Sequence, residues 1–371
     1  MEKRKKRLCF LLMSHFSAVH GGAQYQARIL LESFVKRDEY EIYYVARNID
    51  PGFEPVGYEI VKVPASRYLK RMGFVADYPA LMKVLGGISP DIIYQRGFTA
   101  YTGIAAHYAR KNKARMVLHI ASDLDVMTVP ELWRLPGYNV PFIDKKIGSH
   151  GIRHASAIVT QTRRQKTLLK RNFGREADAV IRNFHPRPLE SLEKPLPLKV
   201  LWVANFKRVK RPELFVRLAR ELGHMSDVEF VMAGRAGDAR LYGDLHREIE
   251  QLGNLRYLGE KTQDEVNRLM AAAHIFVNTS LLEGFPNTFI QAWMRCVPVV
   301  SLGIDTDGIL EEGKIGFCGK TFEEMKSRVA QLLENERQRV GMGEAARRHA
   351  LNEHDLSNVN QLMAVIEGRG A

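Results

Sequence analysis

The first half of the chain alternates short apolar runs with amphipathic stretches. The apolar runs are nearly continuous and rich in Val, Ile and Tyr, which is typical of strands buried on both faces of a parallel sheet. They are Leu8–Met13, Glu41–Ala46, Asp91–Tyr94, Met116–Ile120 and Ala157–Gln161. Stretches such as Ala23–Lys36 and Ala100–Lys111 have helical spacing between them. This alternation predicts an open α/β sheet.

The pattern is interrupted once and then restarts. Four prolines lie between Pro186 and Pro197, and proline removes backbone donors and breaks helices, so we expect an extended linker there. Beyond it, the expected strands are Lys199–Ala204, Val228–Ala233, His274–Asn278 and Val297–Ser301. The expected helices are Arg211–Leu222, Gly243–Leu252, Gln263–Ala272, Phe285–Met294 and a helical tail from Phe322 to Glu367. Two such halves predict a ligand in a cleft between domains, because open α/β sheets bind ligands beyond the carboxyl ends of their strands.

Composition narrows the class of protein. The 371 residues are 45% hydrophobic and 26% charged, ordinary values for a folded protein of two or three domains. The three cysteines are far apart, which favours a reduced, cytoplasmic interior over a disulfide framework. The apolar run Leu8–Met13 is too short for a signal-peptide core, and no apolar segment approaches the ~20 residues that span a bilayer.

The positive charge is concentrated in the first half. Residues 1–190 carry 31 Lys and Arg against 17 Asp and Glu, whereas residues 191–371 carry 24 against 25. This asymmetry indicates an anionic partner for the first half, which leaves nucleic acid, a membrane surface or an acidic substrate open. A solvated basic surface is the simpler alternative.

Two segments at strand–helix junctions are suited to phosphate. Gly21 and Gly22 follow the first strand, and glycines let the backbone approach a ligand at a helix start, although a Gly-Gly turn alone is weak evidence. The run from Lys207 to Arg211 carries four cations just before Pro212, which suits a helix start. Such a run can neutralise a diphosphate, or it can simply be a solvated face.

The third segment is the most informative. Glu283-Gly284-Phe285-Pro286-Asn287-Thr288 follows a predicted strand and leads into a helix that contains Gln291. Backbone amides near Gly284 and Phe285 can face a phosphate, and Glu283 can accept hydrogen bonds from sugar hydroxyls. A capped helix whose polar groups face solvent is the alternative.

With this segment, the chain resembles the retaining, two-domain glycosyltransferases called family 4, or glycosyl transferases group 1, whose signature is Glu-x7-Glu. The resemblance covers nearly the whole chain. It includes the glycine turn, Asn183 after an expected strand at Ala179–Ile181 and before the linker, a phosphate-binding lysine at Lys210, and the strand Val297–Val300 after the signature helix.

The resemblance implies the GT-B fold: α/β, with two Rossmann-like domains facing across a central cleft and C-terminal helices crossing back to the N-terminal domain. We expect residues 1–188 to form the acceptor-side domain and residues 189–350 the donor domain, with residues 351–371 returning as a helix.

The resemblance also assigns roles. Catalytic roles fall on Glu283, Lys210 and His119. The donor nucleotide sugar, UDP- or GDP-linked, would be bound by residues of both domains: Gly21, Gly22, Asn205, Arg208, Lys210, Glu283, Gly284, Phe285, Pro286, Asn287, Thr288 and Gln291. Asp123 and Arg96 would lie on the acceptor side. The resemblance implies that the enzyme needs no cofactor and no metal ion. Asp123 and Asp125 have the spacing of metal ligands, but the resemblance places them in the acceptor domain, so we do not expect a metal site there.

The sequence departs from the family at three places. Gln291 stands where the signature has its second Glu, so a charge-assisted ribose contact is weakened. Asn205 replaces an arginine that usually precedes the phosphate lysine, and Arg208 is the candidate substitute. The family often has a histidine after the strand at Met116–Ile120, and here it is either His119 or is replaced by Ser122 or Asp123.

The expected function is transfer of a sugar, with retention, to a saccharide or lipid-linked acceptor in surface polysaccharide or glycolipid biosynthesis. Basic clusters would place the enzyme in the cytoplasm or peripherally on an anionic inner membrane face: Lys3–Arg7, Lys70-Arg71, Arg110–Arg115, Lys145-Lys146 and Arg163–Arg171. Alternatives are a sugar-nucleotide epimerase and a catalytically weakened relative. A nucleic-acid-binding protein is disfavoured, because basic residues are not interleaved with aromatics and no known module is present.

Overall fold

The computed structural model describes residues 4–19, 21–65, 70–134, 142–189, 193–237 and 239–369, without the side chains of 70–73, 239 and 240. Lys3 and the side chains of Lys70 and Arg71, named above as basic candidates, lie outside this description. The chain divides into two compact units. The first comprises Met1–Asn183 and Ser357–Ala371, and the second comprises Phe184–Leu356. Each is described by itself.

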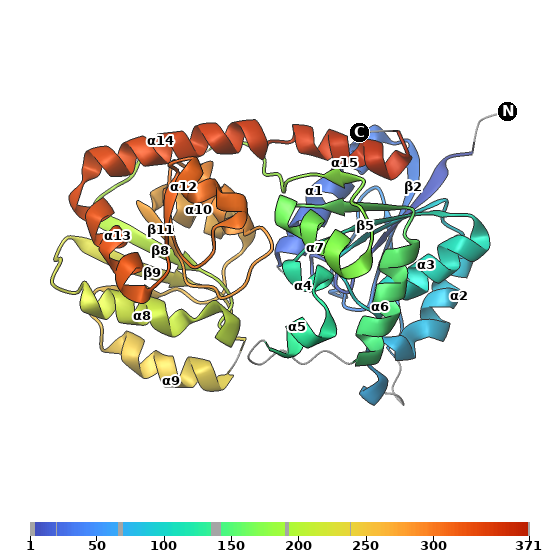
Figure 1. Cartoon of the computed structure of the whole chain (residues 1–371), viewed down its shortest axis with the longest axis horizontal. Coiled ribbons are helices and arrows are strands. Elements are labelled where there is room, and N and C mark those ends of the chain that lie inside the picture. The colour runs from blue at the N-terminus through green and yellow to red at the C-terminus, as the bar shows by residue number, and fades with distance from the viewer. Residues whose placement is uncertain are drawn as a thin grey trace. The chain divides into compact units, whose positions relative to one another are not determined.

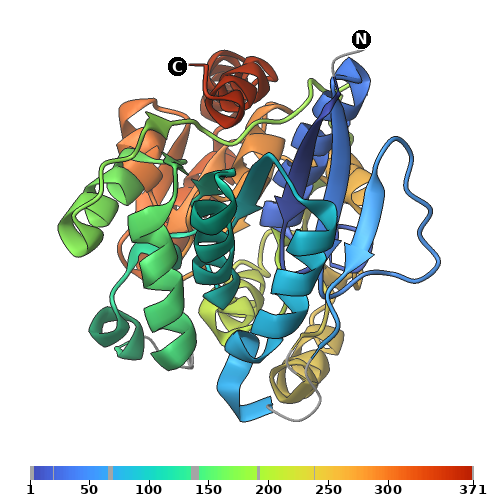
Figure 2. The same cartoon turned by 90° about the vertical axis from the view of Figure 1, so that its right-hand side faces the viewer.

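The first unit contains a seven-stranded parallel sheet in the order β3-β2-β1-β4-β5-β6-β7 (Figure 2). Its strands are β1 Lys6–Leu11, β2 Tyr40–Ala46, β3 Glu59–Lys62, β4 Ile92–Arg96, β5 Arg115–His119, β6 Ala157–Thr160 and β7 Ala179–Val180. Every residue of β4 and β6 is buried, which explains why these strands read as continuous apolar runs.

Helices cover both faces of this sheet. They are α1 Gly22–Arg37, the 3-10 helix Lys70–Asp77, α2 Tyr78–Ile88, α3 Ala100–Asn112, α4 Asp123–Val126, α5 Val129–Trp133, α6 Phe142–His154 and α7 Arg163–Phe173. The α3–α6 pair approaches closely through glycine, because a Cβ at Gly103 would lie 2.1 Å from the Ile147 carbonyl oxygen.

The last helix, α15 Ser357–Glu367, belongs to the first unit although it ends the chain (Figure 1). Arg115 donates to the carbonyl oxygens of Val365 at 3.0 Å and Ile366 at 3.2 Å. The Tyr40 hydroxyl donates to Glu367 at 3.0 Å. The expected return of the C-terminal helix to the first domain is therefore confirmed.

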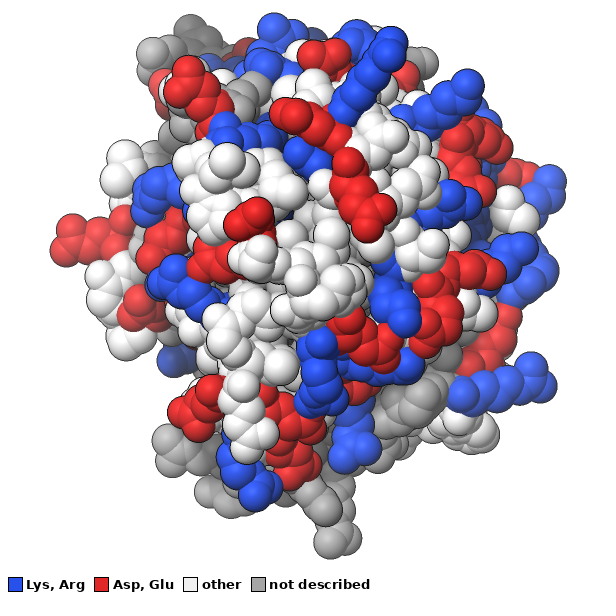
Figure 3. Space-filling view, turned by 90° about the vertical axis from the view of Figure 1, so that its left-hand side faces the viewer, with Lys and Arg blue, Asp and Glu red and all other residues white. Residues whose placement is uncertain are grey.

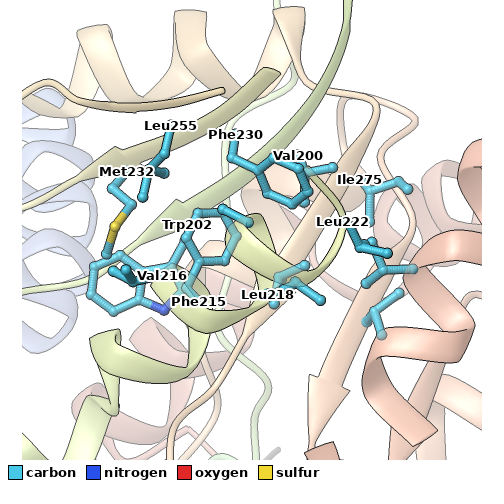
Figure 4. Close-up of a cluster of buried hydrophobic side chains, with 14 of the residues drawn as sticks. Val200, Trp202, Phe215, Val216, Leu218, Leu222, Phe230, Met232, Leu255 and Ile275 are labelled. Carbon is cyan, nitrogen blue, oxygen red and sulfur yellow. The ribbon is translucent and has the colours of Figure 1, made fainter. Parts of the chain in front are cut away.

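The second unit contains a six-stranded parallel sheet in the order β10-β9-β8-β11-β12-β13. Its strands are β8 Leu198–Val203, β9 Val228–Ala233, β10 Leu255–Tyr257, β11 Ile275–Asn278, β12 Val299–Leu302 and β13 Gly316–Gly319. Figure 4 shows one side of its core, where Trp202 of β8 packs with Phe215, Val216 and Met232.

The helices of the second unit lie on the two faces of that sheet. They are α8 Pro212–Glu221, α9 Ala239–Glu250, α10 Gln263–Ala272, α11 Asn287–Trp293, α12 Ile309–Glu312, α13 Phe322–Glu334 and α14 Glu336–Glu353, with 3-10 turns at Arg208–Lys210 and Thr306–Gly308. The face of this unit seen in Figure 3 mixes basic and acidic side chains around an uncharged patch, as expected from the near-neutral balance of the second half.

The α/β class and the two-sheet arrangement are confirmed, but three strands escaped the sequence pattern. They are β3, β10 and β13, which have only three or four residues each and lie at or next to a sheet edge. Short edge strands carry too few apolar positions to be distinguished from loops.

Candidate functional site

Two loops of the second unit bring Lys210 and Glu283 together. Lys210 ends the 3-10 turn that follows β8, and Glu283 lies between β11 and α11. Their side chains form an ion pair in which neither group is fully exposed, at 24% for Lys210 and 17% for Glu283. Since β8 and β11 are neighbours, both residues lie beyond the carboxyl edge of the sheet, where open α/β sheets bind ligands.

Local hydrogen bonds fix the two loops against each other. The Thr279 hydroxyl donates to the Lys210 carbonyl oxygen at 2.7 Å and accepts from the Trp202 indole nitrogen at 2.9 Å. The Leu281 amide donates to the Val209 carbonyl oxygen at 2.8 Å. The Lys210–Glu283 pair is therefore held by backbone on both sides and does not depend on two flexible side chains alone.

Arg211 braces this junction, whereas the sequence pattern marked it only as one of four cations that can neutralise a diphosphate. Its guanidinium donates to the carbonyl oxygens of Thr279 at 2.6 Å, Ser280 at 3.3 Å and Leu302 at 3.2 Å, so it ties together the ends of β11 and β12. Burial lowers the pKa of Arg211 below its usual range. Its left-handed backbone, with φ 49°, precedes Pro212, whose ring disfavours the right-handed helical conformation at the residue before it.

The exit of β9 adds a residue that the sequence pattern missed. Arg235 is exposed directly after β9, and its amide donates to the Asn205 side-chain oxygen at 3.2 Å. Gly234 allows this approach: it has φ 149°, and a Cβ there would lie 1.8 Å from the Ala204 carbonyl oxygen. Arg208, the predicted substitute cation, is exposed in the neighbouring turn. A cation directly after a strand was the available signal for Arg235.

The turn from Glu283 to Thr288 leads into α11, which begins at Asn287 with Pro286 as its N-terminal cap residue. Phe285 anchors the turn, since its buried ring packs against His354 with a centroid separation of 4.8 Å and against Trp293 at 6.1 Å. The Gly284 carbonyl oxygen accepts from the Thr306 hydroxyl at 3.3 Å. Phe285 thus has a structural position, and the donor contacts of Gly284, Asn287 and Thr288 stay predictions.

Gln291, the predicted ribose ligand, lies on α11 with 2% of its surface exposed. Its amide nitrogen donates to the Asn267 side-chain oxygen of α10 at 2.8 Å. This contact joins two helices and commits part of the amide. A ribose contact would therefore fall to the remaining side-chain oxygen.

In the first unit, the glycine turn begins α1 as expected. Gly21 is the N-terminal cap residue, with extended backbone at φ −107° and ψ 164°, and the helix starts at Gly22. A Cβ at Gly21 would lie 2.5 Å from the Gln24 side-chain oxygen. His20, part of the same motif, lies outside the described residues.

His119 and Arg96 form one buried network at the ends of β5 and β4, where they are register partners. The Arg96 guanidinium donates to His119 Nδ1 at 2.8 Å, and the Tyr94 hydroxyl lies 2.9 Å from the same nitrogen. The same guanidinium nitrogen lies 3.1 Å from Nε2. Because arginine can only donate, the ring nitrogen that it contacts is an acceptor, and the ring is neutral. Burial, followed by the Arg96 charge, holds the pKa of His119 well below its usual value. His119 is therefore a neutral ring that orients Arg96.

The two aspartates with metal-like spacing face different partners. Asp123 Oδ2 accepts from Arg164 at 2.9 Å, whereas Asp125 Oδ2 accepts from the Ala121 amide at 2.7 Å and the Ser122 amide at 3.1 Å. Within the described residues, no three His, Cys, Asp or Glu side chains are grouped so as to hold a metal ion.

The prediction that basic residues face a lipid surface is wrong for Lys145. Lys145 is 3% exposed and donates to the carbonyl oxygens of Leu124 and Asp125, both at 3.1 Å, and burial lowers its pKa to about 8. Other basic candidates are engaged in ion pairs on the unit's own surface: Arg7 with Glu41, Lys170 with Glu176, and Arg171 with Glu131. Within the described ranges, no helix is both long and apolar enough to cross a bilayer.

The sheets and helices above define a GT-B fold. Sucrose-phosphate synthase from Thermosynechococcus elongatus has this architecture with a TM-score of 0.78, at 12% identity, over 98% of this chain and 99% of that one. HepE of Anabaena, in complex with UDP and glucose, is similar with a TM-score of 0.74, at 17% identity, over 98% of this chain and 99% of that one. Likenesses at such low identity establish the fold.

The second unit carries the sequence similarity. Residues 189–349 match the family model of glycosyl transferases group 1. D-inositol 3-phosphate glycosyltransferase of Corynebacterium aurimucosum is 27% identical over 175 residues, which are 44% of this chain and 42% of that protein. The matched stretch thus spans less than half of the length of that relative. The residues matched by the family model include both Lys210 and Glu283.

Proposed function

We propose that this protein is a glycosyltransferase that moves a sugar from a nucleoside diphosphate sugar to a saccharide or lipid-linked saccharide acceptor, with retention of configuration. The observation that carries the proposal is the Lys210–Glu283 pair at the carboxyl edge of the second sheet. A cation suited to phosphate and a carboxylate suited to sugar hydroxyls are held side by side by the backbone of two loops.

Each group has a task for which its chemistry is suited. In this proposal Lys210 binds the diphosphate and stabilises the negative charge that develops as the nucleoside diphosphate leaves. Preorganised electrostatic stabilisation is commonly the largest single contribution to catalysis. Glu283 accepts hydrogen bonds from the hydroxyls of the donor sugar, and Gln291 from the ribose. Arg208 and Arg235 lie close in sequence to the strand ends and would supplement Lys210.

Without donor, Lys210 and Glu283 neutralise each other. A donor diphosphate competes for the Lys210 ammonium and releases the Glu283 carboxylate for the sugar. The pair therefore couples recognition of the phosphate to recognition of the sugar, because each half of the donor replaces one partner of the ion pair. His119 orients Arg96 in this scheme and does not transfer a proton, since its Nδ1 is already engaged.

The comparisons support this proposal without identifying substrates. The family match covers the donor-side unit, and HepE, one of the similar structures, contains UDP and glucose. We extend the proposal to a UDP- or GDP-linked donor, to catalysis without a metal ion, and to work in surface polysaccharide or glycolipid synthesis in the cytoplasm. Peripheral membrane association is proposed from the net positive charge of the first half. The ion pairs within the first unit leave fewer basic side chains for a lipid surface.

The test is release of nucleoside diphosphate. Purified full-length protein is incubated with a panel of nucleotide sugars and a membrane glycolipid extract, with and without EDTA. We expect acceptor-dependent release from one donor, unchanged by EDTA and abolished by Lys210→Ala and by Glu283→Ala. Lys326→Ala is the matched control, because Lys326 is ion-paired with Glu221 on the surface of the same unit.

Other outcomes would redirect the assignment. Release without acceptor would indicate hydrolysis or epimerisation. Neither release nor donor binding would overturn the proposal and leave Asn205 and Gln291 as marks of a lost activity.

A further inference from the structure

Arg96 is a buried cation without a carboxylate partner. Its side chain ends β4 and is 5% exposed, yet it takes part in no ion pair among the described residues. Burial raises the pKa of Asp125 and the Arg96 charge partly opposes this, but Asp125 Oδ2 accepts hydrogen bonds from two backbone amides. Arginine stays charged in proteins, so burying it without an opposite charge is unfavourable for folding.

Several other buried or partly buried cations among the described residues have a different set of partners. Arg211, Arg339, Lys145 and Lys194 each donate to two or more backbone carbonyl oxygens, which marks them as structural braces. Arg96 instead donates to a neutral imidazole nitrogen and, at 2.7 Å, to the Asn183 side-chain oxygen. Its Nε has no hydrogen-bond partner. The guanidinium is oriented by neutral side chains, and part of its donor capacity is unused.

A second unsatisfied group lies at the same carboxyl edge of the sheet. His119 is the register partner of both Arg96 on β4 and Val159 on β6, and Gln161 is two residues beyond Val159. Gln161 therefore lies just past the end of β6, which is at Thr160. Gln161 donates to the Ile120 carbonyl oxygen at 2.6 Å, while its own side-chain oxygen is buried without a partner.

Together these residues place a charged donor at the carboxyl end of β4 and a neutral acceptor just beyond the carboxyl end of β6, with β5 between the two strands. This is the edge at which open α/β sheets bind ligands. A planar guanidinium matches a carboxylate or a phosphate through two parallel hydrogen bonds. An amide oxygen suits a hydroxyl group. A ligand that satisfies both is an anion that also carries a hydroxyl.

We propose that Arg96 binds a carboxylate or phosphate group of the acceptor, and that Gln161 accepts a hydrogen bond from an adjacent hydroxyl. The acceptor would then be an acidic or phosphorylated saccharide. The identification of this ligand as the acceptor rests on the proposed function, but anion binding at Arg96 can be measured without any sugar transfer.

The competing explanation is that Arg96 merely pins Asn183, which ends the first stretch of the unit. The two explanations predict different effects of Arg96→Gln on the free energy of unfolding. If Arg96 is a pin, Arg96→Gln destabilises the fold strongly. If Arg96 is held charged for a ligand, replacing it by a neutral group is neutral or stabilising in the absence of ligand, because an uncompensated buried charge is removed.

The experiment is titration calorimetry on the full-length protein with D-glucuronate, inorganic phosphate and D-glucose as separate probes. We expect saturable binding of glucuronate or of phosphate and none of glucose; the better probe tells a carboxylate from a phosphate acceptor. Arg96→Gln weakens that binding at least 10-fold, and Arg110→Gln, which changes an exposed arginine of α3, leaves it unchanged. Arg96→Lys, which keeps the charge but not the paired geometry, gives an intermediate affinity.

Absence of anion binding to the native protein, or equal binding by Arg96→Gln, overturns the inference. If Arg96→Gln does not fold, the Arg96→Lys titration decides, and unchanged affinity there counts against a paired contact. Failure of the transfer assay with anion binding intact would instead contradict the proposed function alone.

Discussion

Lys210 and Glu283 are ion-paired although 73 residues separate them in the chain. The pair exists because β8 and β11 are neighbours in the sheet and because Thr279 and Arg211 lock the loops that follow them. The two charges, which would otherwise be solvated separately, largely neutralise each other in the ion pair. A ligand that carries both phosphate and hydroxyl groups can replace both partners and break the pair.

Because the ligand would break this ion pair, we expect Glu283→Gln to affect nucleoside diphosphate affinity and sugar transfer differently. Glu283→Gln removes the carboxylate that competes with phosphate for Lys210, so nucleoside diphosphate affinity stays equal or rises. Transfer falls by about 10- to 100-fold, the range expected for loss of a charged hydrogen bond of ~1.5–3 kcal/mol. Calorimetry with UDP and GDP, together with kcat measurements, tests both effects. Weaker diphosphate binding by Glu283→Gln would contradict the competition between the two groups.

Arg211 is predicted to be a stability residue that sequence signatures overlook. Arg211→Met leaves the carbonyl oxygens of Thr279, Ser280 and Leu302 without their donor. We expect the free energy of unfolding to fall by about 2–4 kcal/mol, since buried groups left unpaired cost ~1–3 kcal/mol each and partly relax. Denaturant unfolding followed by fluorescence reports on this unit, which contains Trp202 and Trp293. Arg217→Met, at an exposed arginine of α8, is the control and should change little.

Gly234 is predicted to tolerate no side chain. An alanine Cβ would lie 1.8 Å from the Ala204 carbonyl oxygen, and the glycine has φ 149°. Gly234→Ala should therefore destabilise the second unit by ~1–3 kcal/mol, as overpacking does, and should separate Asn205 from Arg235. Gly243→Ala on α9 is the matched control, because nothing lies within 4 Å of its would-be Cβ. Equal stability of the two variants in thermal unfolding would contradict the close approach.

His15 is predicted to make the first unit sensitive to acid. It is fully buried, its Nδ1 lies 2.7 Å from the Ser17 hydroxyl oxygen, and burial lowers its pKa from 6.5 to about 4. Between these values the unfolded chain binds a proton that the folded chain does not. The free energy of unfolding therefore decreases as pH falls from about 6.5 to about 4.

Replacing His15 by Gln should flatten that pH dependence, whereas His107→Gln, which changes an exposed histidine of the same unit, should not. Unfolding curves at a series of pH values measure the slope. His274 in the second unit contributes in the same direction, because burial and then Lys194 lower its pKa to about 4 as well. An unchanged slope in His15→Gln would show that other groups dominate acid unfolding.

The order of strands and helices was largely determined by local sequence. Buried parallel strands are continuous apolar runs, so β1, β4, β5, β8 and β9 could be placed within a residue or two. The glycine turn at Gly21 and the turn at Glu283 could also be placed, because their residues impose local backbone geometry. The short strands β3, β10 and β13 could not, since their pairing depends on neighbours that are distant in the chain.

The tertiary structure decided which charges meet. The family resemblance marked Lys210, Glu283, Arg96 and His119 separately as candidates. Only the sheet order makes β8 the neighbour of β11 and aligns Arg96 with His119. In the tertiary structure, Lys145 is buried against carbonyl oxygens of α4 and so does not belong to the predicted basic surface. Arg211 has three carbonyl partners. A charge acts over a few ångströms, and that separation is set by packing between segments far apart in sequence.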